Sequence, residues 1–486
     1  ADPLPHGGRR AYAAHRPDPA GRLLPAHLLC RGGGNPVPLQ DAAGAAGGAA
    51  GAALYRADAS LDAFPGGVRM SRVIFHVDVN SAFLSWSAAY RVRVLGERED
   101  LRGIPSAVAG ERAERHGIIL AKSIPAKKCG VKTGEQIFLA QQKCPGLKLV
   151  PPDYALYVQA SRRFIALLRE FAPVVEQYSI DEAWADLSGT EGLYGSPVAA
   201  AELLRARIRE ELGFTVNVGI GTNKLLAKMA SDFEKPDKVH TLFPNEIPVK
   251  MWPLPVRDLL FLGKASEKKL TEAGMYTIGD MAHARETEIQ VLLGKKAGHQ
   301  LYRYACGIDD SPVKAQPEEA KGFSVETTFN DDIVSVDQVL PILLEQCDVV
   351  ATRMRRKGKK CISVSVTFRT LDFKNKSHQT TLPNATDTTD EIYKKAKKLF
   401  TESWKGEPLR LIGVALTNLT DESFEQLSLF EDNEKKERKR KLDATMDAIR
   451  QKFGNDKITR ASIMNSNSGI ARKARAQMKN EDEKPE

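Results

Sequence analysis

The sequence predicts a multidomain protein of the α+β class, for three reasons. The chain has 486 residues, too many for one ordinary hydrophobic core, so we expect several domains of roughly 100 to 150 residues each. From residue 73 to about 241, strand and helix patterns interleave as in one mixed sheet. Residues 321–420 then show the element order β-α-β-β-α-β, the ferredoxin-like arrangement.

The composition favours a polyanionic partner. Lys and Arg together number 71 against 62 Asp and Glu, a formal net charge of +9, although net charge informs association rather than fold. The six cysteines form no CxxC pair, so we expect free thiols in a reducing compartment. No apolar run approaches the roughly 18 residues of a membrane span, and we therefore expect a cytoplasmic protein.

The N-terminal tract has a different composition from the rest. Residues 1–69 are about half Ala, Gly and Pro and contain no lysine. Met70 is the first methionine, so we expect a disordered or non-native tract and a natural start at Met70. A secretory signal is the competing interpretation, but the apolar stretch LLPAHLLC is short and leads into RGGG rather than a cleavage site.

The first ordered segment alternates with a period of two, which predicts a strand. One face consists of Val73, Phe75, Val77 and Val79. Asp78 lies on the opposite face. Further along we predict an amphipathic helix over 154–171, a strand pair around Asp181, a helix over 198–212 and the strand TVNVGIG.

Residues 178–187, YSIDEAWADL, place two adjacent carboxylates in an otherwise apolar, strand-like run. An ionised carboxylate is costly to bury without a partner, so a positive group must lie nearby. Asp181 and Glu182 would point to opposite faces of a straight strand, and we therefore predict a tight bend there. Together with Asp78 they would form an oxygen-rich site suited to Mg²⁺. A surface turn with ordinary salt bridges is the alternative for the pair alone.

Residues 242–312 have an all-helical pattern, followed by a polar linker over 313–320. They include LLGKKAGHQLY, with Gly294, Lys295, Lys296 and Gly298. Backbone amides and lysines at a helix start could hold a DNA phosphate. A simple turn between two helices is the alternative.

The β-α-β-β-α-β segment predicts a sheet with one polar face. In its third element, Ile362, Val364, Val366 and Phe368 alternate with Ser363, Ser365, Thr367 and Arg369. Such a face could follow a phosphate backbone, or it could simply be solvated. Beyond it, the charged run EDNEKKERKRK is interpreted as a solvated linker, with nucleic-acid contact as the alternative, and LDATMDAIRQKF as a helix.

Three motifs carry a resemblance to a known family. HVDVNSAF, YSIDEA and ASDFEKPDK resemble the nucleotide-site signatures of the Y-family translesion DNA polymerases, particularly the bacterial DNA polymerase IV group. The resemblance covers roughly residues 70–430 and implies a right-hand polymerase. The implied domains are palm (70–79 and 151–241), fingers (80–150), thumb (242–312), linker (313–320), little finger (321–423) and a tail (424–486).

The same resemblance implies a two-metal reaction. Asp78, Asp181 and Glu182 match the metal-binding acids, and Val79 matches the position that supplies a backbone carbonyl to the metal. Two Mg²⁺ ions would then promote template-directed, low-fidelity addition of deoxynucleotides to a primer 3′-hydroxyl.

Residues around the nucleotide are also implied, with some departures. Phe83 matches the aromatic steric gate against ribonucleotides, and Lys235 matches the lysine that contacts the triphosphate. Lys127 stands where arginine is usual. The sequence departs from the family pattern at Ala121, Ile124, Asn80 and Phe261, where threonine, tyrosine, aspartate and a hairpin glycine are usual.

A short peptide after the little finger resembles the bacterial sliding-clamp motif. It consists of Gln426, Leu427, Ser428, Leu429 and Phe430. An extended peptide of this kind would place its two last apolar side chains in a pocket of the clamp. The implied partners are primer-template DNA, deoxynucleotides and the sliding clamp, and we expect a monomer.

Two other functions would use some of the same features. A nucleotidyl cyclase would use a similar acid pair, but it would lack the β-α-β-β-α-β module, the thumb and the clamp peptide. A non-catalytic accessory protein that binds DNA or the clamp usually loses one of the three acids, whereas this chain keeps all three. An active polymerase is therefore favoured.

Overall fold

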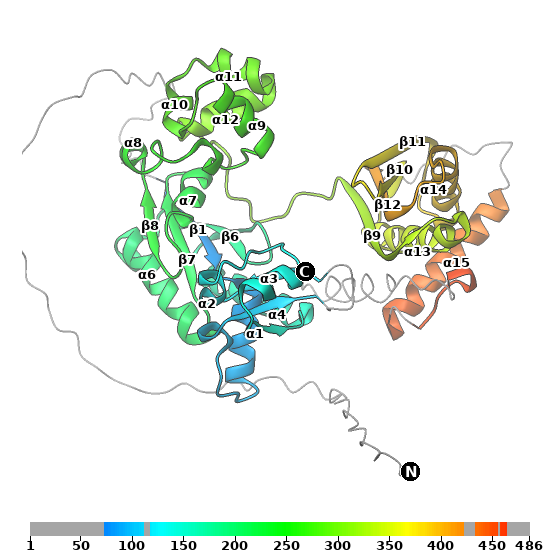
Figure 1. Cartoon of the computed structure of the whole chain (residues 1–486), viewed down its shortest axis with the longest axis horizontal. Coiled ribbons are helices and arrows are strands. Elements are labelled where there is room, and N and C mark those ends of the chain that lie inside the picture. Colours follow the sequence, from blue (N-terminus) through cyan, green and yellow to red (C-terminus); the bar gives the residue numbers. More distant parts are fainter. Residues whose placement is uncertain (1–71, 111–116, 422–432, 455–456, 464–486) are drawn as a thin grey trace, which may run out of the picture. The chain divides into compact units, whose positions relative to one another are not determined.

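The structure is a computed structural model that describes residues 72–110, 117–421, 433–454 and 457–463 (Figure 1). The expectations for residues 1–69 and for the clamp peptide 426–430 lie outside the described residues. The five described cysteines are free thiols, as expected. Within the described ranges, no helix is both long and apolar enough to cross a membrane.

The palm contains a five-stranded sheet in the order β5-β6-β1-β7-β8. Its strands are β1 (Ile74–Val79), β5 (Val174–Gln177), β6 (Glu182–Asp186), β7 (Val216–Gly221) and β8 (Val239–Leu242). β1 is antiparallel to both β6 and β7, and β7 is parallel to β8. All six residues of β1 are buried because it is the central strand (Figure 1).

Helices cover both faces of this sheet. The predicted apolar row of β1 packs with α4 (Tyr154–Phe171) and α6 (Pro197–Arg207), and a π-helical turn over Ile208–Leu212 continues α6. On the other face Ile74 packs with Ala227 of α7 (Lys224–Ser231). The period-two pattern and the helix over 154–171 are thus confirmed.

A glycine on β7 allows α7 to lie unusually close to the sheet. A Cβ atom at Gly219 would be 2.0 Å from the Ala227 carbonyl oxygen and 2.3 Å from the Ser231 backbone nitrogen. Any other residue would push the helix outward, since real Cβ atoms do not approach backbone atoms so closely. Gly219 lies opposite His76 in the sheet register, so this contact sets how near α7 comes to the polar face of β1.

The fingers form a separate small sheet in the order β3-β2-β4. They comprise α1 (Ala82–Arg93), β2 (Ser106–Ala109), β3 (Ile119–Lys122), α2 (Ile124–Lys128), α3 (Ile137–Lys143) and β4 (Lys148–Val150). α1 begins three residues after β1 ends, and Leu84 of α1 packs with Val108 of β2. The end of β1 is therefore the junction between palm and fingers.

The thumb is helical, as predicted, and keeps its first hairpin despite an unusual residue. Its helices are α8 (Ile247–Lys250), α9 (Lys264–Glu272), α10 (Ile278–His283), α11 (Glu286–Leu293) and α12 (Lys295–Ala305). Phe261 precedes α9 with φ at +66°, the left-handed conformation that glycine adopts most easily, and its side chain is 59 % exposed. Phe261 thus reproduces the backbone turn and adds an exposed ring to it.

The little finger has the predicted order of elements but not the strand order of a ferredoxin-like sheet. Its elements are β9 (Gly322–Ile333), α13 (Val336–Arg356), β10 (Lys360–Thr370), β11 (Asn375–Thr386), α14 (Thr389–Ser403) and β12 (Leu409–Thr420). The sheet order is β11-β10-β12-β9, with all pairs antiparallel. The last strand lies beside the second, whereas a ferredoxin-like sheet places the first and third strands at its centre.

The predicted facing of β10 is wrong at its start. A bulge shifts the register between Cys361 and Ser363, and a bulge reverses which side chains face the core. Ile362 is therefore partly exposed, while Ser363 is fully buried and accepts a hydrogen bond from the Asn418 amide at 2.9 Å. The alternation from Val364 to Phe368 holds as predicted.

The charged run after residue 430 is a helix rather than a linker. α15 extends over Asn433–Phe453 and includes the described part of the run, from Asn433 onward. Its acidic and basic residues pair with the little finger: Arg355 donates to Asp447 at 2.7 Å, and Arg440 pairs with Asp387 at 3.1 Å. Arg355 lies on α13 and Asp387 lies just before α14, so charged side chains of α15 dock this helix on the little finger (Figure 1).

The centre of this docking surface is a buried ion pair. Arg450 of α15 donates to Asp348 of α13 at 2.6 Å, and both side chains are almost completely buried. Burial alone raises the pKa of Asp348, but Arg450 and Arg460 more than offset it, so the pKa lies below its usual value. Asp348 therefore stays ionised inside the domain and depends on α15 for its counter-charge.

Replacing this arginine should release α15. Arg450→Met leaves Asp348 buried with only Arg460 as a partner, which should cost about 3 kcal/mol. We expect amide hydrogen exchange across residues 434–453 to accelerate roughly 100-fold, measured by mass spectrometry. Arg285→Ala, which removes an exposed pair with Glu288, serves as the control and should leave that exchange unchanged. Equal exchange in Arg450→Met and the parent would contradict the docking role.

Candidate active site

The chain turns sharply at the two adjacent carboxylates, as predicted. β5 and β6 are antiparallel neighbours, and the backbone amides of Tyr178 and Ser179 donate to the Glu182 carbonyl at 3.0 and 3.1 Å. Asp181 lies in the bend and Glu182 is the first residue of β6. The bend frees the two side chains from the alternation of a straight strand.

Asp78 and Glu182 are brought together by the sheet. They are register partners on β1 and β6, and the Val79 amide donates to the Asp181 carbonyl at 3.0 Å. The hydroxyl of Ser179 donates to Asp181 Oδ1 at 2.6 Å and accepts from the Asp181 and Glu182 backbone amides. All three acids thus lie together at the edge of the sheet where β1 ends and β6 begins.

The positive partner that the sequence required is Lys228 of α7. Its ammonium donates to Glu182 Oε2 at 2.9 Å and lies 3.4 Å from His76 Nε2. His76 Nδ1 is 2.8 Å from the Ser231 hydroxyl, which itself donates to the Lys228 carbonyl, so Nδ1 carries the hydrogen. Burial, followed by Lys228 and Lys235, holds the pKa of His76 well below its usual value, and the ring is neutral.

A second lysine holds the other carboxylate. Lys235 lies 3.1 Å from Asp78 Oδ2 and 2.7 Å from Asp232 Oδ1. Sequence analysis placed Lys235 at the site but missed Lys228, although a signal was present. Lys228 stands between Leu225 and Met229 on the buried side of a short helix, where a charge implies a buried counter-charge.

The carboxyl pair remains short of positive charge in spite of the two lysines. Burial, opposed by Lys235 and reinforced by the neighbouring Glu182, raises the pKa of Asp78 to about 7. Burial also acts on Glu182, but hydrogen bonds from Asp78 and Lys228 leave its pKa below the usual value. Of the two carboxyls, Asp78 is therefore the one that takes up a proton more readily.

These donors fit a hard divalent cation. In the described part of the chain, no three His, Cys, Asp or Glu side chains are close enough to enclose an ion as they stand. A buried carboxyl that keeps a proton near neutral pH nevertheless marks a place where added positive charge is stabilising. Asp78, Asp181 and Glu182, with the Val79 carbonyl, could hold such a cation through oxygen ligands alone.

The ring of Phe83 is held in place by its aromatic neighbours. It lies on α1 and stacks on Tyr157 with ring centroids 4.4 Å apart and an interplanar angle of 8°. The Tyr157 hydroxyl is 3.0 Å from the Ser87 hydroxyl, which fixes the supporting ring in turn. Phe83 is only partly buried, so it is packed on one side and open on the other.

The fingers contribute two neighbouring lysines. Lys127 is exposed on α2, and Lys122 of β3 donates to the Thr133 hydroxyl at 2.9 Å. Burial and then the charge of Lys127 lower the pKa of Lys122, so sequence analysis missed a second cation here. Ile124 is half exposed, whereas Ala121 is buried against Leu84 and Val108. Ala121 therefore stands in the core, and the hydroxyl that a threonine would have at this position is absent from the core rather than from the surface.

Asn80 has a structural role that an aspartate could not fill unchanged. Its amide nitrogen donates to Asn217 Oδ1 at 3.1 Å, and its amide oxygen accepts from the Thr215 hydroxyl and the Asp237 backbone amide. A carboxylate has no hydrogen for the first of these bonds. Asn80 thus ties the end of β1 to β7 and to the segment that carries Lys235.

The predicted DNA-binding residues of the thumb divide into two groups. Lys295 and Lys296 are exposed at the start of α12, directly after Gly294, whose φ is +90°. Gly298 is buried, and a Cβ there would be 2.5 Å from the Gln290 Cα. Gly298 therefore permits the close crossing of α11 and α12 and is not itself placed to contact a ligand.

Comparison with known proteins agrees with this geometry. Family models described as the impB/mucB/samB family and its C-terminal domain match residues 77–232 and 320–429, and one described as the DNA polymerase-iota thumb domain matches 258–309. DNA polymerase IV of Clostridium acetobutylicum is 45 % identical over 398 residues, which cover 81 % of this chain and 99 % of that protein. DNA polymerase IV 1 of Bacillus subtilis is 34 % identical over 400 residues, covering 81 % and 94 %.

A solved structure shows the same fold. A Y-family DNA polymerase chimera superposes with a TM-score of 0.63 at 24 % identity, covering 72 % of this chain and all of that one. With the acids of β1 and β6 at one edge of the palm and the relatives matched over nearly their whole length, the chain belongs to the Y-family DNA polymerases, in the DNA polymerase IV group, and is a DNA-directed polymerase of translesion synthesis.

Proposed function

We propose that the chain performs this synthesis by two-metal nucleotidyl transfer, with Asp78, Asp181 and Glu182 as the metal-binding acids. Members of this family depend on divalent metal, and we propose two Mg²⁺ ions. The observation that carries the proposal is the convergence of the acids at the ends of β1 and β6, where the Asp78 carboxyl lacks sufficient positive charge. When bound, the ions supply Lewis-acid activation of the primer 3′-hydroxyl and charge neutralisation at the phosphates.

The residues of the chain then have distinct roles. Asp181 would help to hold both ions, and Glu182 would help to hold the one that activates the primer 3′-hydroxyl. Lys228 keeps Glu182 oriented through its 2.9 Å hydrogen bond. Its ammonium supplies the positive charge that compensates Glu182 from the buried side of the sheet. Asp78 would hold a cation as a carboxylate, and Lys235, which pairs with Asp78 in this structure, would then be able to pair with the incoming triphosphate.

The nucleotide sugar is selected by the fixed ring of Phe83. Because Phe83 is supported by Tyr157, it cannot easily move aside for a ribose 2′-hydroxyl. Lys127, with Lys122 beside it, is proposed to contact the triphosphate from the fingers. These two cations compensate for the hydroxyl group that the family usually has at position 124.

Further partners follow from the domain organisation. The exposed lysines at the start of α12 and the Gly294 turn are proposed to contact the DNA backbone. We also propose that residues 426–430 bind the sliding clamp, and that the enzyme acts as a monomer in the cytoplasm. No observation favours a non-catalytic accessory protein.

The metal-site assignment is tested by primer extension. Asp181→Ala together with Glu182→Ala should reduce Mg²⁺-dependent extension of a primed template by about 10³-fold or more, because both ion positions lose ligands. Glu170→Ala with Glu211→Ala, which removes two exposed palm acids bound to Arg207, is the matched control. Retained extension in the first variant, or an equal loss in the control, would refute the assignment.

The gate assignment is tested by sugar selectivity. Phe83→Ala should raise the relative incorporation of ribonucleotides by about 10- to 200-fold, since one steric contact is worth roughly 1–3 kcal/mol. Phe83→Tyr keeps the ring and should keep the discrimination. Single-nucleotide incorporation with matched ribo- and deoxynucleotides measures both. If sugar selectivity is the same in Phe83→Ala and the parent, Phe83 is not the gate.

Clamp binding is tested by stimulation of synthesis. Leu429→Ala with Phe430→Ala should abolish the increase in extension that a loaded bacterial clamp gives, while extension without clamp stays the same, because only the tether is lost. Phe424→Ala removes an apolar side chain just outside the motif and should retain stimulation. A full clamp response in the double variant would remove this partner from the proposal.

A further inference from the structure

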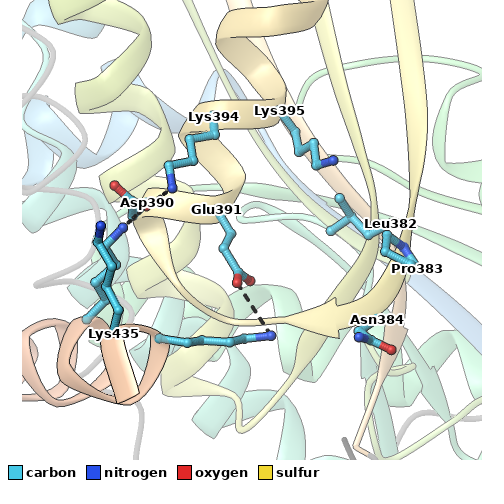
Figure 2. A pocket seen from close by; sticks show the side chains of 10 residues that line it. Leu382, Pro383, Asn384, Asp390, Glu391, Lys394, Lys395 and Lys435 are labelled. Carbon is cyan, nitrogen blue, oxygen red and sulfur yellow. Dashed lines mark hydrogen bonds and ion pairs between the residues drawn. The ribbon is translucent and has the colours of Figure 1, made fainter. Parts of the chain in front are cut away.

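A concave surface rich in lysine lies on the little finger. It is a groove of about 280 Å³ between β11, α14 and α15. Its lining consists of Leu382, Pro383, Asn384, Asp390, Glu391, Lys394, Lys395, Lys435, Lys436 and Lys439. Figure 2 shows the two acids between the lysines of α14 and those of α15.

The described lining of the groove is predominantly basic, with five lysines and two carboxylates. Asp390 pairs with Lys439 and, at 3.1 Å, with Lys394, and Glu391 pairs with Lys436 at 3.4 Å. Both acids are thus already engaged, and they hold the lysines around the groove rather than cancelling their charge.

α15 completes this groove and is held rigidly in place. Three of the five lysines come from the charged run of α15, and the Arg450–Asp348 pair anchors the same helix on α13. A charge run that only keeps a protein soluble does not have to form a docked helix. It also does not require acids between its own lysines and the lysines of another helix. The run therefore has a use beyond solubility.

The lining indicates which kind of polyanion fits. Among the described residues that line the groove none is aromatic, so bases would find no stacking partner. β11 is an edge strand, but Pro383 has no N–H to donate to an added peptide strand. Flexible lysines act as point charges for phosphate, and a groove of this volume cannot admit a duplex.

We propose that this groove binds the phosphodiester backbone of single-stranded DNA without regard to base sequence. It is a contact additional to polymerase activity, on the helical side of the little finger. It gives the enzyme a grip on unpaired DNA that involves neither the carboxylates of β1 and β6 nor the thumb lysines.

The test is the salt dependence of DNA binding by the full chain. A fluorescein-labelled thymidine oligonucleotide is titrated with protein at several NaCl concentrations, and polarisation is read. Lys394→Ala with Lys395→Ala should reduce the slope of log affinity against log salt by about 1.4, since each lost phosphate contact on single strands contributes roughly 0.7. Lys397→Ala with Lys398→Ala removes the same charge from the same helix outside the groove and should change the slope far less.

Two further measurements distinguish the groove from the thumb lysines and DNA from an acidic protein partner. A blunt duplex should bind the groove variant and its control equally, while Lys295→Ala with Lys296→Ala should weaken duplex binding. Equal slopes for the two α14 variants on single strands, or loss confined to the duplex, would overturn the proposal. So would tighter groove-dependent binding of poly-glutamate than of DNA, which would indicate an acidic protein partner. Because the readout is binding, the result does not depend on catalysis.

Discussion

The pairing of buried carboxylates with two lysines is the interaction on which the arrangement of the palm depends. Asp78 and Glu182 lie opposite each other on neighbouring strands. Two carboxyl groups so close together cannot both be ionised unless nearby positive charge compensates them. Lys228 and Lys235 supply it from α7 and from the segment that follows α7. Lys228 reaches Glu182 only because Gly219 lets α7 approach the sheet. A glycine on one strand thus determines the electrostatics of an acid two strands away.

The same arrangement explains how the site is prepared for substrate. Without a cation the proton on Asp78 and the Lys235 ammonium share the task of neutralising the site. In the proposed mechanism a divalent ion would take over that task, and Lys235 would become available to a triphosphate. Lys228, by contrast, is nearly buried behind Glu182 and also contacts His76, so it remains in place. One lysine is exchangeable and the other is structural.

The sequence predicted features that arise locally or from a motif. The alternation of β1, the helix over 154–171 and the bend at Asp181 follow from periodicity and from the cost of a buried charge. What it could not predict depends on contacts distant in the sequence. Lys228 contacts an acid 46 residues earlier, and the strand order of the little finger depends on where β12 inserts. The charged run docks as a helix because acids at and just before the start of α14 bind its lysines and arginines. The bulge at Ile362 likewise has no marker in its own residues.

The most direct measurement of the central claim is crystallographic. Crystals of the enzyme with primer-template DNA, a non-hydrolysable deoxynucleoside triphosphate and Mn²⁺ would show the ions by anomalous scattering. The account predicts peaks within about 2.3 Å of oxygens of Asp78, Asp181 and Glu182, with Lys235 moved from Asp78 to the triphosphate and Lys228 still on Glu182. Peaks bound elsewhere, or none at these carboxylates with nucleotide in place, would contradict the account.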